Sequence, residues 1–226
     1  MTNKLYIVAT PVGNLEDITL RALRVLKDVD LIFAEDTRVA KKLLAHFGIG
    51  TPIVRRHTRD EQKAAEEIIV ALDIGKNAAL ISDAGTPGIS DPGSFIVAQV
   101  RKELPEIKIE VVPGPSALAA AISVAGVSAN EFLFLGFLPH KKGRETLFKE
   151  IAATARPVIF YESPHRILKT LESLKKFTPE KKITICRELT KIYEEVITGS
   201  AAELVEFFTK NSEKVRGEFV VLVSKK

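Results

Sequence analysis

The strongest structural signal in the chain reads Ala78-Ala79-Leu80-Ile81-Ser82-Asp83-Ala84-Gly85-Thr86-Pro87-Gly88-Ile89-Ser90-Asp91-Pro92-Gly93. Its four leading residues are apolar and predict a buried strand. The twelve that follow contain three glycines and two prolines, a composition that predicts a long loop. A helix is expected next, with Asp91 as its cap and Pro92 in its first position. Open α/β sheets bind ligands beyond the carboxyl ends of their strands, so we expect a binding site in this loop.

The length and content of the loop favour a ligand site over an ordinary connection, which remains the alternative. Strand-to-helix connections usually have about two to six residues. This one is longer and places Asp83 and Asp91 beside glycines. The chain contains neither the G-x-x-x-x-G-K-[ST] pattern nor the G-x-G-x-x-G pattern. P-loop nucleotidases and standard dinucleotide enzymes are therefore disfavoured.

The composition indicates a globular protein with a substantial core. The chain has 226 residues, 46% of them hydrophobic, which suits one large or two small domains. A net charge of +4 permits a polyanionic partner without requiring one. The single cysteine, Cys186, stands in an apolar run and is expected in the core of a protein from a reducing compartment. With no signal-peptide layout and no apolar stretch long enough to span a bilayer, a cytoplasmic location is expected.

The first half alternates strands with helices and predicts a parallel sheet with helices on both faces. The expected strands are residues 5–9, 31–34, 53–54, 78–81 and 107–112, and Asp60 is expected to cap the helix that ends at Ile74. In a parallel sheet the carboxyl ends of neighbouring strands meet at one edge. The polar segments 10–14, 35–38 and 82–91 would therefore line a common pocket.

The second half predicts a mixed sheet. Residues 113–117, Pro-Gly-Pro-Ser-Ala, form the expected hinge, so we expect domains 1–113 and 114–226. Strands are expected at 132–135, 158–161, 183–186, 193–198 and 218–223, and helices at 145–153, 167–177 and 201–209. Strands 183–186 and 193–198 leave no room for a helix between them, which implies antiparallel pairing. The fold class is therefore α/β with two domains.

Several motifs together resemble a known family. They are Leu5-Tyr6-Ile7-Val8-Ala9-Thr10-Pro11-Val12-Gly13-Asn14, Ala34-Glu35-Asp36-Thr37-Arg38, the loop 82–93, Pro113-Gly114-Pro115-Ser116-Ala117, Gly136-Phe137-Leu138-Pro139, Tyr161-Glu162-Ser163-Pro164-His165-Arg166 and Arg187-Glu188-Leu189-Thr190-Lys191. In this order, over nearly the whole chain, they are similar to the tetrapyrrole methylase superfamily of S-adenosylmethionine-dependent methyltransferases. The resemblance is to the branch that methylates small-subunit ribosomal RNA.

The resemblance implies a two-domain tetrapyrrole-methylase-like fold, a homodimer, and S-adenosylmethionine bound in a cleft between the domains. The implied reaction is 2′-O-methylation of a cytidine ribose in 16S rRNA of the small ribosomal subunit. The implied cofactor-binding residues are Pro11, Asp83, Ala84, Gly85, Thr86, Ser116, Ala117, Glu162, Leu189 and Phe219. Family members often continue with a further C-terminal segment, whereas this chain ends at Lys226.

Methyl transfer from a sulfonium to an oxygen is an in-line displacement that requires no metal, and positioning of the two reactants is the main task of the protein. A base that accepts the hydroxyl proton would help. The candidates are Glu35, Asp36, Glu162 and His57, and none stands above the rest. The alternative for Glu35 and Asp36 is an internal ion pair with Arg38. For Asp83 it is a carboxylate that braces backbone amides.

Three basic clusters are expected to contact RNA phosphates. Their members are Arg38, Lys41, Lys42, Arg55, Arg56, Arg59, Lys141, Lys142 and Arg144. The alternative is that these side chains form only a solvated face.

Two other functions remain open on the sequence. A tetrapyrrole methyltransferase, acting on uroporphyrinogen-type or precorrin-type compounds, would share the scaffold. A ribosome-assembly factor that binds S-adenosylmethionine without catalysis belongs to a different class, although the intact loop motifs argue against it.

Overall fold

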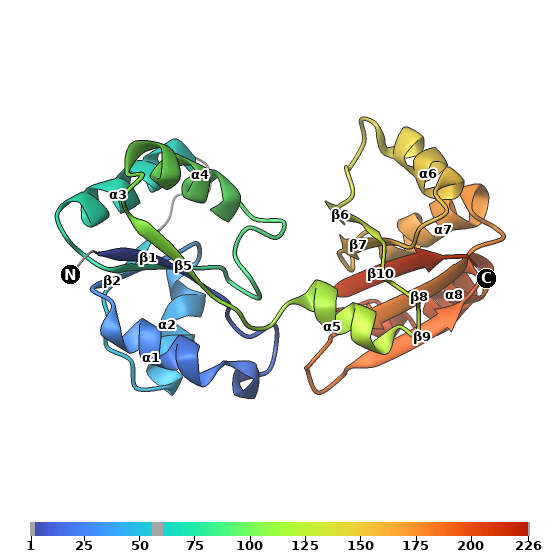
Figure 1. The fold of residues 1–226 in the computed structure, drawn as a ribbon. Coiled ribbons are helices and arrows are strands. Elements are labelled where there is room, and N and C mark those ends of the chain that lie inside the picture. The colour runs from blue at the N-terminus through green and yellow to red at the C-terminus, as the bar shows by residue number, and fades with distance from the viewer. Residues whose placement is uncertain (1–2, 56–60, 226) are drawn as a thin grey trace. The chain divides into compact units, whose positions relative to one another are not determined.

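The computed structural model describes residues 3–55 and 61–225. Contacts within the chain divide it after Ser116 into two compact units (Figure 1). The first is built around a parallel sheet and the second around a mixed sheet. Each unit has helices on both faces of its sheet and its own buried clusters.

The sheet of the first unit has five strands in the order β3-β2-β4-β1-β5. Their bounds are Lys4–Val8 for β1, Leu31–Ala34 for β2, Ile53–Arg55 for β3, Ala78–Ile81 for β4 and Lys108–Val112 for β5. Every neighbouring pair is parallel, so the prediction of a parallel sheet is confirmed. Strand β4 lies at the centre of this sheet and has the bounds that the sequence predicted.

Within the described residues of the first unit, four α-helices cover the sheet on both faces, as predicted (Figure 1). They are α1 (Leu20–Asp28), α2 (Thr37–His46), α3 (Glu61–Asp73) and α4 (Gly93–Glu103), and a short 3-10 turn, η1 (Leu15–Asp17), precedes α1. Helices α1 and α2 pack with Ala79 and Ile81 of β4, whereas α3 and α4 pack with Ala78 and Leu80. Because successive side chains of a strand point to opposite faces, the continuous apolar run of β4 fills both halves of the core.

The sheet of the second unit has the order β6-β7-β10-β8-β9. Its strands are β6 (Leu133–Phe137), β7 (Val158–Glu162), β8 (Lys182–Arg187), β9 (Glu195–Gly199) and β10 (Phe219–Ser224). Strands β6 and β7 are parallel, and all other neighbours are antiparallel. The predicted mixed sheet and the antiparallel pairing of β8 with β9 are therefore confirmed.

Helices α6 (Arg144–Ala153), α7 (Ile167–Phe177) and α8 (Ala201–Lys210) contribute to the cluster on one face of the second sheet. Helix α5 (Ala117–Val124) packs on the other face. A 3-10 turn, η2 (Ser212–Lys214), follows α8. Ser200 caps α8 in a capping box with Glu203, which satisfies backbone N–H groups that a helix start leaves unpaired.

Two local predictions are wrong. Helix α4 begins at Gly93 with Pro92 as its N-cap, rather than with Pro92 as its first residue. Strand β6 includes Gly136 and Phe137, which were expected in a loop, because Phe137 still pairs with Tyr161 of β7 after a shift of register that follows Phe134. The positive φ of Gly136, +58°, lies at this irregularity. The expected cap Asp60 lies outside the described residues.

Cys186 lies in the core, as predicted, on the face of β8 that packs against α5. Burial and, to a smaller degree, the charge of Glu194 raise the pKa of its thiol to about 11. None of the helices within residues 3–55 and 61–225 has the length and apolar content needed to cross a bilayer.

We expect Cys186 to resist alkylation in the folded protein. With a pKa of about 11, roughly one thiol in a thousand is ionised at pH 8, and only the thiolate reacts. Iodoacetamide should leave the native protein unmodified over a period in which glutathione reacts completely. Mass spectrometry should then find one carbamidomethyl group after denaturation. Rapid modification of the native protein would contradict the buried position.

Candidate functional site

Hydrogen bonds join the carboxyl ends of β1 and β4. The N–H of Thr10 donates to the carbonyl of Gly85 (2.9 Å), and the N–H of Gly85 donates to the carbonyl of Thr10 (3.0 Å). The hydroxyl of Thr10 also donates to the carbonyl of Ser82 (3.1 Å). All three residues are buried. These bonds continue beyond the paired strands and attach the loop 82–93, here called the central loop, to the first strand.

Asp91 shapes the far half of the central loop. Its Oδ1 atom accepts hydrogen bonds from the N–H groups of Gly88 (2.7 Å) and Gly93 (2.6 Å). Gly88 has a φ of +88°, which glycine adopts without strain. A Cβ atom at position 93 would lie 2.8 Å from Asp91 Oδ1, so the turn leaves no space for a side chain there. The central loop thus holds its own shape.

The end of β5 reaches the same edge. The hydroxyl of Thr86 donates to the carbonyl of Pro115 (3.0 Å). Gly85 has a φ of +81°, and a Cβ atom there would lie 3.9 Å from the Cα atom of Ser116. Gly114 packs closely on Ala9, because a Cβ at 114 would lie 3.0 Å from the Cβ of Ala9. The central loop and the segment after β5 both hold expected cofactor-binding residues, and these two segments are therefore in contact.

Asp83 connects the central loop to the end of β2. Its Oδ1 atom accepts a hydrogen bond from the N–H of Asp36 (3.0 Å). Asp83 therefore holds a backbone amide, as in the alternative interpretation. This amide belongs to the segment after β2 and not to the central loop. Asp83 and Ala84 are exposed to solvent, so both also remain accessible to a ligand.

Asp36 and Arg38 form an ion pair at the start of α2. The guanidinium Nη2 lies 2.6 Å from Asp36 Oδ2, and the N–H of Arg38 donates to Asp36 Oδ1 (2.8 Å). Asp36 is also the N-cap of the helix. The hydrogen bond from Arg38 holds the pKa of the Asp36 carboxyl well below its usual range. A carboxylate in this state is a weak base, so the ion-pair interpretation fits Asp36 better than proton transfer.

The first unit therefore gathers eight of the expected site residues at one sheet edge. They are Pro11, Glu35, Asp36, Asp83, Ala84, Gly85, Thr86 and Ser116, in the segments that follow β1, β2, β4 and β5. Pro11 and Gly85 are buried, while Glu35, Thr86 and Ser116 are half-buried. Parallel pairing brings these ends together, as the alternation of elements predicted.

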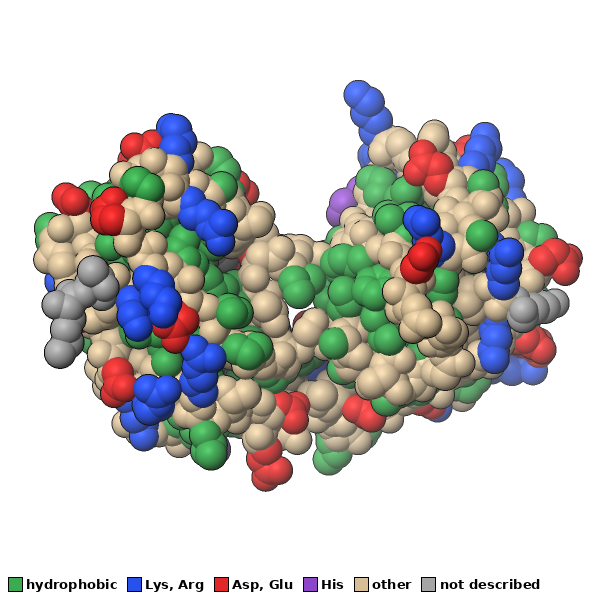
Figure 2. All heavy atoms as spheres, in the orientation of Figure 1, with side chains coloured by type: hydrophobic (Ala, Val, Ile, Leu, Met, Phe, Trp, Pro, Cys, Tyr) green, Lys and Arg blue, Asp and Glu red, His purple; other side chains and the backbone are tan. Residues whose placement is uncertain are grey.

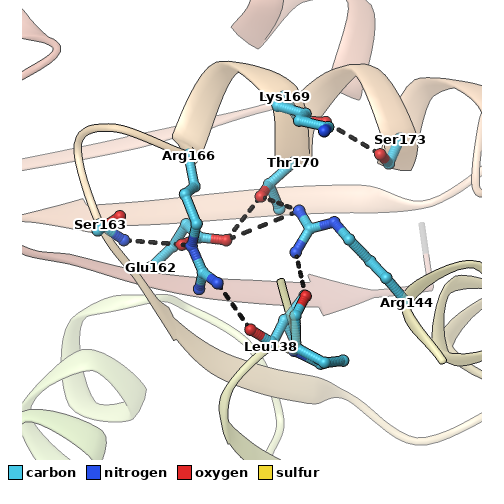
Figure 3. A network of polar contacts seen from close by, with 9 residues as sticks. Leu138, Arg144, Glu162, Ser163, Arg166, Lys169, Thr170 and Ser173 are labelled. Atoms are coloured by element: carbon cyan, nitrogen blue, oxygen red, sulfur yellow. Dashed lines mark hydrogen bonds and ion pairs between the residues drawn. The ribbon is translucent and has the colours of Figure 1, made fainter. Parts of the chain in front are cut away.

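Glu162, at the end of β7, is the centre of a buried polar network (Figure 3). Its Oε1 atom accepts hydrogen bonds from Arg166 Nε (2.6 Å) and from the N–H of Ser163 (2.8 Å). Its Oε2 atom accepts one from the hydroxyl of Thr170 (2.6 Å) and lies 3.9 Å from Arg144 Nη2. The side chain has no exposed surface. Both oxygens are thus engaged, and the expected roles of Glu162 as a base and as a cofactor ligand do not fit this geometry.

The two arginines of the network fasten the segment that follows β6. Arg166 Nη1 donates to the carbonyl of Leu138 (2.8 Å; Figure 3). Arg144 Nη1 donates to the carbonyl of Pro139 (3.0 Å). Arg144 Nη2 also donates to the hydroxyl of Thr170 (2.7 Å). Glu162 therefore ties the turn after β7, helix α7 and the segment after β6 into one body.

Arg144 is a correction to the expected RNA contacts. Only 9% of the residue is exposed, and its guanidinium lies over the ring of Phe148 (5.1 Å to the centroid). Burial lowers the pKa of this guanidinium. It is directed into the network, and is unavailable to a phosphate. The sequence placed it beside Lys141 and Lys142, but the start of α6 turns its side chain inward.

The other basic residues differ in position. Arg38, Lys41 and Lys42 are exposed on α2, and Arg55 is exposed on β3, in register with Ala34 of β2. These four thus lie near the end of β2. Lys141 and Lys142 are exposed before α6 in the second unit, while Arg56, His57 and Arg59 lie outside the described residues. Figure 2 shows Lys and Arg side chains among acidic ones on one face.

The remaining expected cofactor residues lie in the second unit. Leu189 is buried in the cluster that includes α5, which Ala117 begins. Phe219 is buried on the opposite face of the sheet, with α8. The fold therefore does not bring Phe219 and Leu189 together on one face. Sequence reasoning missed Arg166 and Thr170 as partners of Glu162, because the pairing spans a strand end, a turn and a helix and leaves no periodic signal in the sequence.

Comparison with known proteins identifies the family. Residues 4–205 match the family model described as Tetrapyrrole (Corrin/Porphyrin) Methylases. The chain belongs to this family, and it is a methyltransferase.

Within the family, the chain is similar over its whole length to proteins named Ribosomal RNA small subunit methyltransferase I. The relative from Thermotoga maritima is 43% identical, with 99% of each chain covered. The one from Vibrio cholerae is 46% identical over 97% of this chain and 76% of its own. The resemblance found in the motifs is thereby confirmed.

A solved structure with the same fold is that of uroporphyrin-III C-methyl transferase from Thermus thermophilus, complexed with S-adenyl homocysteine. It has a TM-score of 0.68 at 15% identity and covers 98% of this chain and 97% of its own. This likeness concerns the fold.

Glu162→Gln should destabilise the protein by about 3 kcal/mol or more, because it leaves Arg166 and Arg144 buried without an anionic partner. Urea unfolding followed by circular dichroism measures the change. Glu145→Gln is the matched control, because it removes the same charge from an ion pair with Lys149 in which both side chains are more than 60% exposed. The control should change stability by no more than about 0.5 kcal/mol. Equal effects of the two substitutions would contradict a structural role for Glu162.

Proposed function

We propose that this protein transfers a methyl group from S-adenosylmethionine to the 2′-oxygen of a cytidine ribose in 16S rRNA of the small ribosomal subunit. The observation that carries the proposal is the full-length similarity, at 43% identity, to a protein named Ribosomal RNA small subunit methyltransferase I. The buried residues that shape the central loop, including Thr10, Ser82 and Gly85, support the choice of site.

The edge of the first sheet offers chemical groups that suit S-adenosylmethionine. The exposed carboxylate of Asp83 suits a ligand that carries a sulfonium and an ammonium group. Asp83 and Ala84 are exposed residues, and we propose that their backbone amide groups contact the adenosine. Gly85, at φ +81°, lets the loop turn beside these two residues without strain. Pro11, Thr86 and Ser116 complete the first-unit contacts, and Ala117 is proposed from the second unit.

When bound, the cofactor supplies an activated methyl group on a sulfonium. The chain contributes orientation, because in-line attack requires the ribose oxygen to lie about 3 to 3.5 Å from the methyl carbon. The bonds between Thr10 and Gly85 and the brace from Asp83 to Asp36 fix the surfaces that would hold the donor. Preformed loops of this kind reduce the entropy lost when two reactants are aligned.

Two of the expected bases remain candidates, Glu35 and His57, and His57 lies outside the described residues. Asp36 is held in an ion pair, and Glu162 is buried with both oxygens engaged. Glu35 is half-buried at the same edge as Asp83. Proton loss from the ribose hydroxyl would proceed towards its carboxylate or towards water.

The RNA partner would contact the exposed cations Arg38, Lys41, Lys42 and Arg55 of the first unit and Lys141 and Lys142 of the second. Each phosphate contact releases counterions, so affinity should fall steeply with salt. We further propose that the protein acts as a homodimer in the cytoplasm, because the resemblance implies a dimer and the substrate is ribosomal.

Methylation of isolated subunits tests the function directly. The purified protein, methyl-labelled S-adenosylmethionine and small subunits that lack the modification should give label on one cytidine ribose, located by nuclease digestion and mass spectrometry. Subunits that already carry the methyl group are the control and should take up none.

The other functions are separate outcomes of this experiment. Label on a uroporphyrinogen-type compound and none on the subunit would indicate a tetrapyrrole methyltransferase. Subunit binding without turnover on either substrate would indicate an assembly factor. Either result would refute the proposal.

Asp83→Ala should abolish cofactor binding, or weaken it at least about tenfold, because a hydrogen-bonded charge typically contributes about 1.5–3 kcal/mol. Calorimetric titration with S-adenosylmethionine measures the change. Asp83→Asn keeps an oxygen that can accept from the N–H of Asp36 and removes only the charge. If both variants bind S-adenosylmethionine weakly, the charge of Asp83 contacts the cofactor. If Asp83→Asn binds normally and Asp83→Ala does not, Asp83 acts only by accepting the hydrogen bond from Asp36. Exposed Asp73, at the end of α3, provides a control, and Asp73→Ala should bind normally.

A further inference from the structure

A hollow of about 630 Å³ lies in the second unit, and all its lining residues belong to that unit. It is lined by Pro164, His165, Leu168, Ser212, Val215, Arg216 and Gly217. Pro164 and His165 belong to the turn after β7, and Leu168 to the first turn of α7. The other residues come from η2 and the segment that leads into β10. Two segments about fifty residues apart in the chain thus form its walls.

We propose that this hollow, here called the 165/216 pocket, binds one nucleotide of single-stranded RNA, with Arg216 on the phosphate and His165 against the base. The inference rests on the proposed function, because it assigns part of the RNA substrate to a specific place. It adds a contact that the sequence did not predict, since neither residue was among the expected RNA-binding residues.

The lining has the two kinds of surface that a nucleotide requires. Pro164, Leu168 and Val215 are apolar and form a surface for a base or ribose. Arg216, His165 and Ser212 are exposed and offer hydrogen-bond donors. Single-stranded RNA is recognised by stacking of its bases on His or aromatic rings and on Arg planes, together with phosphate contacts. Pockets of about 300–1,000 Å³ are typical of small-ligand sites, a range that includes a mononucleotide.

The charge of the pocket favours an anion. Among the seven described residues that line it, Arg216 carries a formal positive charge and none is acidic. The nearby carboxylate of Glu218 is engaged by Lys191, whose Nζ lies 2.9 Å from Glu218 Oε2. Arg216 is thus able to receive a phosphate without a competing carboxylate in the lining.

The wall that carries His165 is held from beneath by the buried network. Glu162 accepts from the N–H of Ser163, and the N–H of Arg166 donates to the carbonyl of Ser163 (3.0 Å). Pro164 and His165 lie between these two fixed residues. Because Arg166 is also held by Glu162, the turn cannot move without breaking these partly buried hydrogen bonds. Glu162 is therefore a positioning residue for this pocket.

The opposite wall is fixed at Gly217. This residue has a φ of +85°, and a Cβ atom there would lie 2.3 Å from the Cδ of Glu188. The carboxylate of Glu188 accepts from the N–H of Glu218 (2.9 Å), directly after Gly217. The N–H of Val215 donates to the carbonyl of Ser212 (3.1 Å). Both walls are therefore preformed, which lowers the entropy lost on binding.

Single substitutions in the 165/216 pocket test the proposal. Arg216→Ala and His165→Ala should each raise KM for the small subunit about tenfold, with kcat and calorimetric affinity for S-adenosylmethionine unchanged, because one phosphate or one stacking contact is lost. Arg156→Ala is the matched control. Arg156 is exposed, pairs with Glu131 on the surface, and precedes β7 at the end opposite to Ser163. The control should keep the KM of the unmodified protein.

Direct binding separates this inference from the proposed function. A short fluorescein-labelled oligoribonucleotide should bind the unmodified protein, and Arg216→Ala should weaken binding and reduce the slope of log K against log salt by roughly 0.7. A 4-thiouridine in the same RNA should cross-link to peptides that contain residues 164–168 or 212–217. Subunit methylation with unchanged KM in both pocket variants and no cross-link would refute the pocket and leave the function standing. Cross-linking and weakened oligonucleotide binding without any methylation would support the pocket and refute the function.

Discussion

The paired backbone hydrogen bonds between Thr10 and Gly85 are the constraint on which the candidate site depends. They join the loop after β1 to the loop after β4, and the other contacts of the edge are arranged around them. Thr86 then reaches Pro115 at the end of β5, and Asp83 reaches the end of β2. Four chain segments that are far apart in sequence become one surface. A parallel sheet makes this possible, because it places all its carboxyl ends on the same side.

In the second unit, the loops at the strand ends are held together by a side chain rather than by paired backbone groups. Its sheet is mixed, so its strand ends do not all meet at one edge, and a buried carboxylate organises the loops instead. Glu162 holds the turn after β7 directly and, through Arg166, holds the carbonyl of Leu138 in the segment after β6. Such an ion pair contributes little net stability compared with apolar packing, but leaving its arginines unpaired is strongly unfavourable. Its main contribution is therefore a fixed geometry for the segments that it joins.

The two units differ in whether backbone bonds or side chains shape their loops, and this difference suggests how one fold can serve methylases with different substrates. The fold is shared with a uroporphyrin-III C-methyl transferase at only 15% identity, whereas the relatives named for ribosomal RNA retain 43% or more in the cases compared. A fold does not specify a substrate, and substrate choice depends on the side chains at particular sites. The central loop forms its shape largely through backbone groups and short side chains. The 165/216 pocket and the exposed lysines instead depend on long side chains, which can change without altering the sheets.

The order of strands and helices, the two sheets and the central loop followed from the sequence alone, because periodicity, glycines and prolines act locally. The motifs also identified the family, since they recur in order over nearly the whole chain. The tertiary structure decided what each charged side chain contacts. Glu162 and Arg144 looked like functional groups in the sequence, but residues brought close by folding, such as Thr170, enclose them. Burial and long-range pairing decide whether a charge is available to a ligand, and neither is encoded in local spacing.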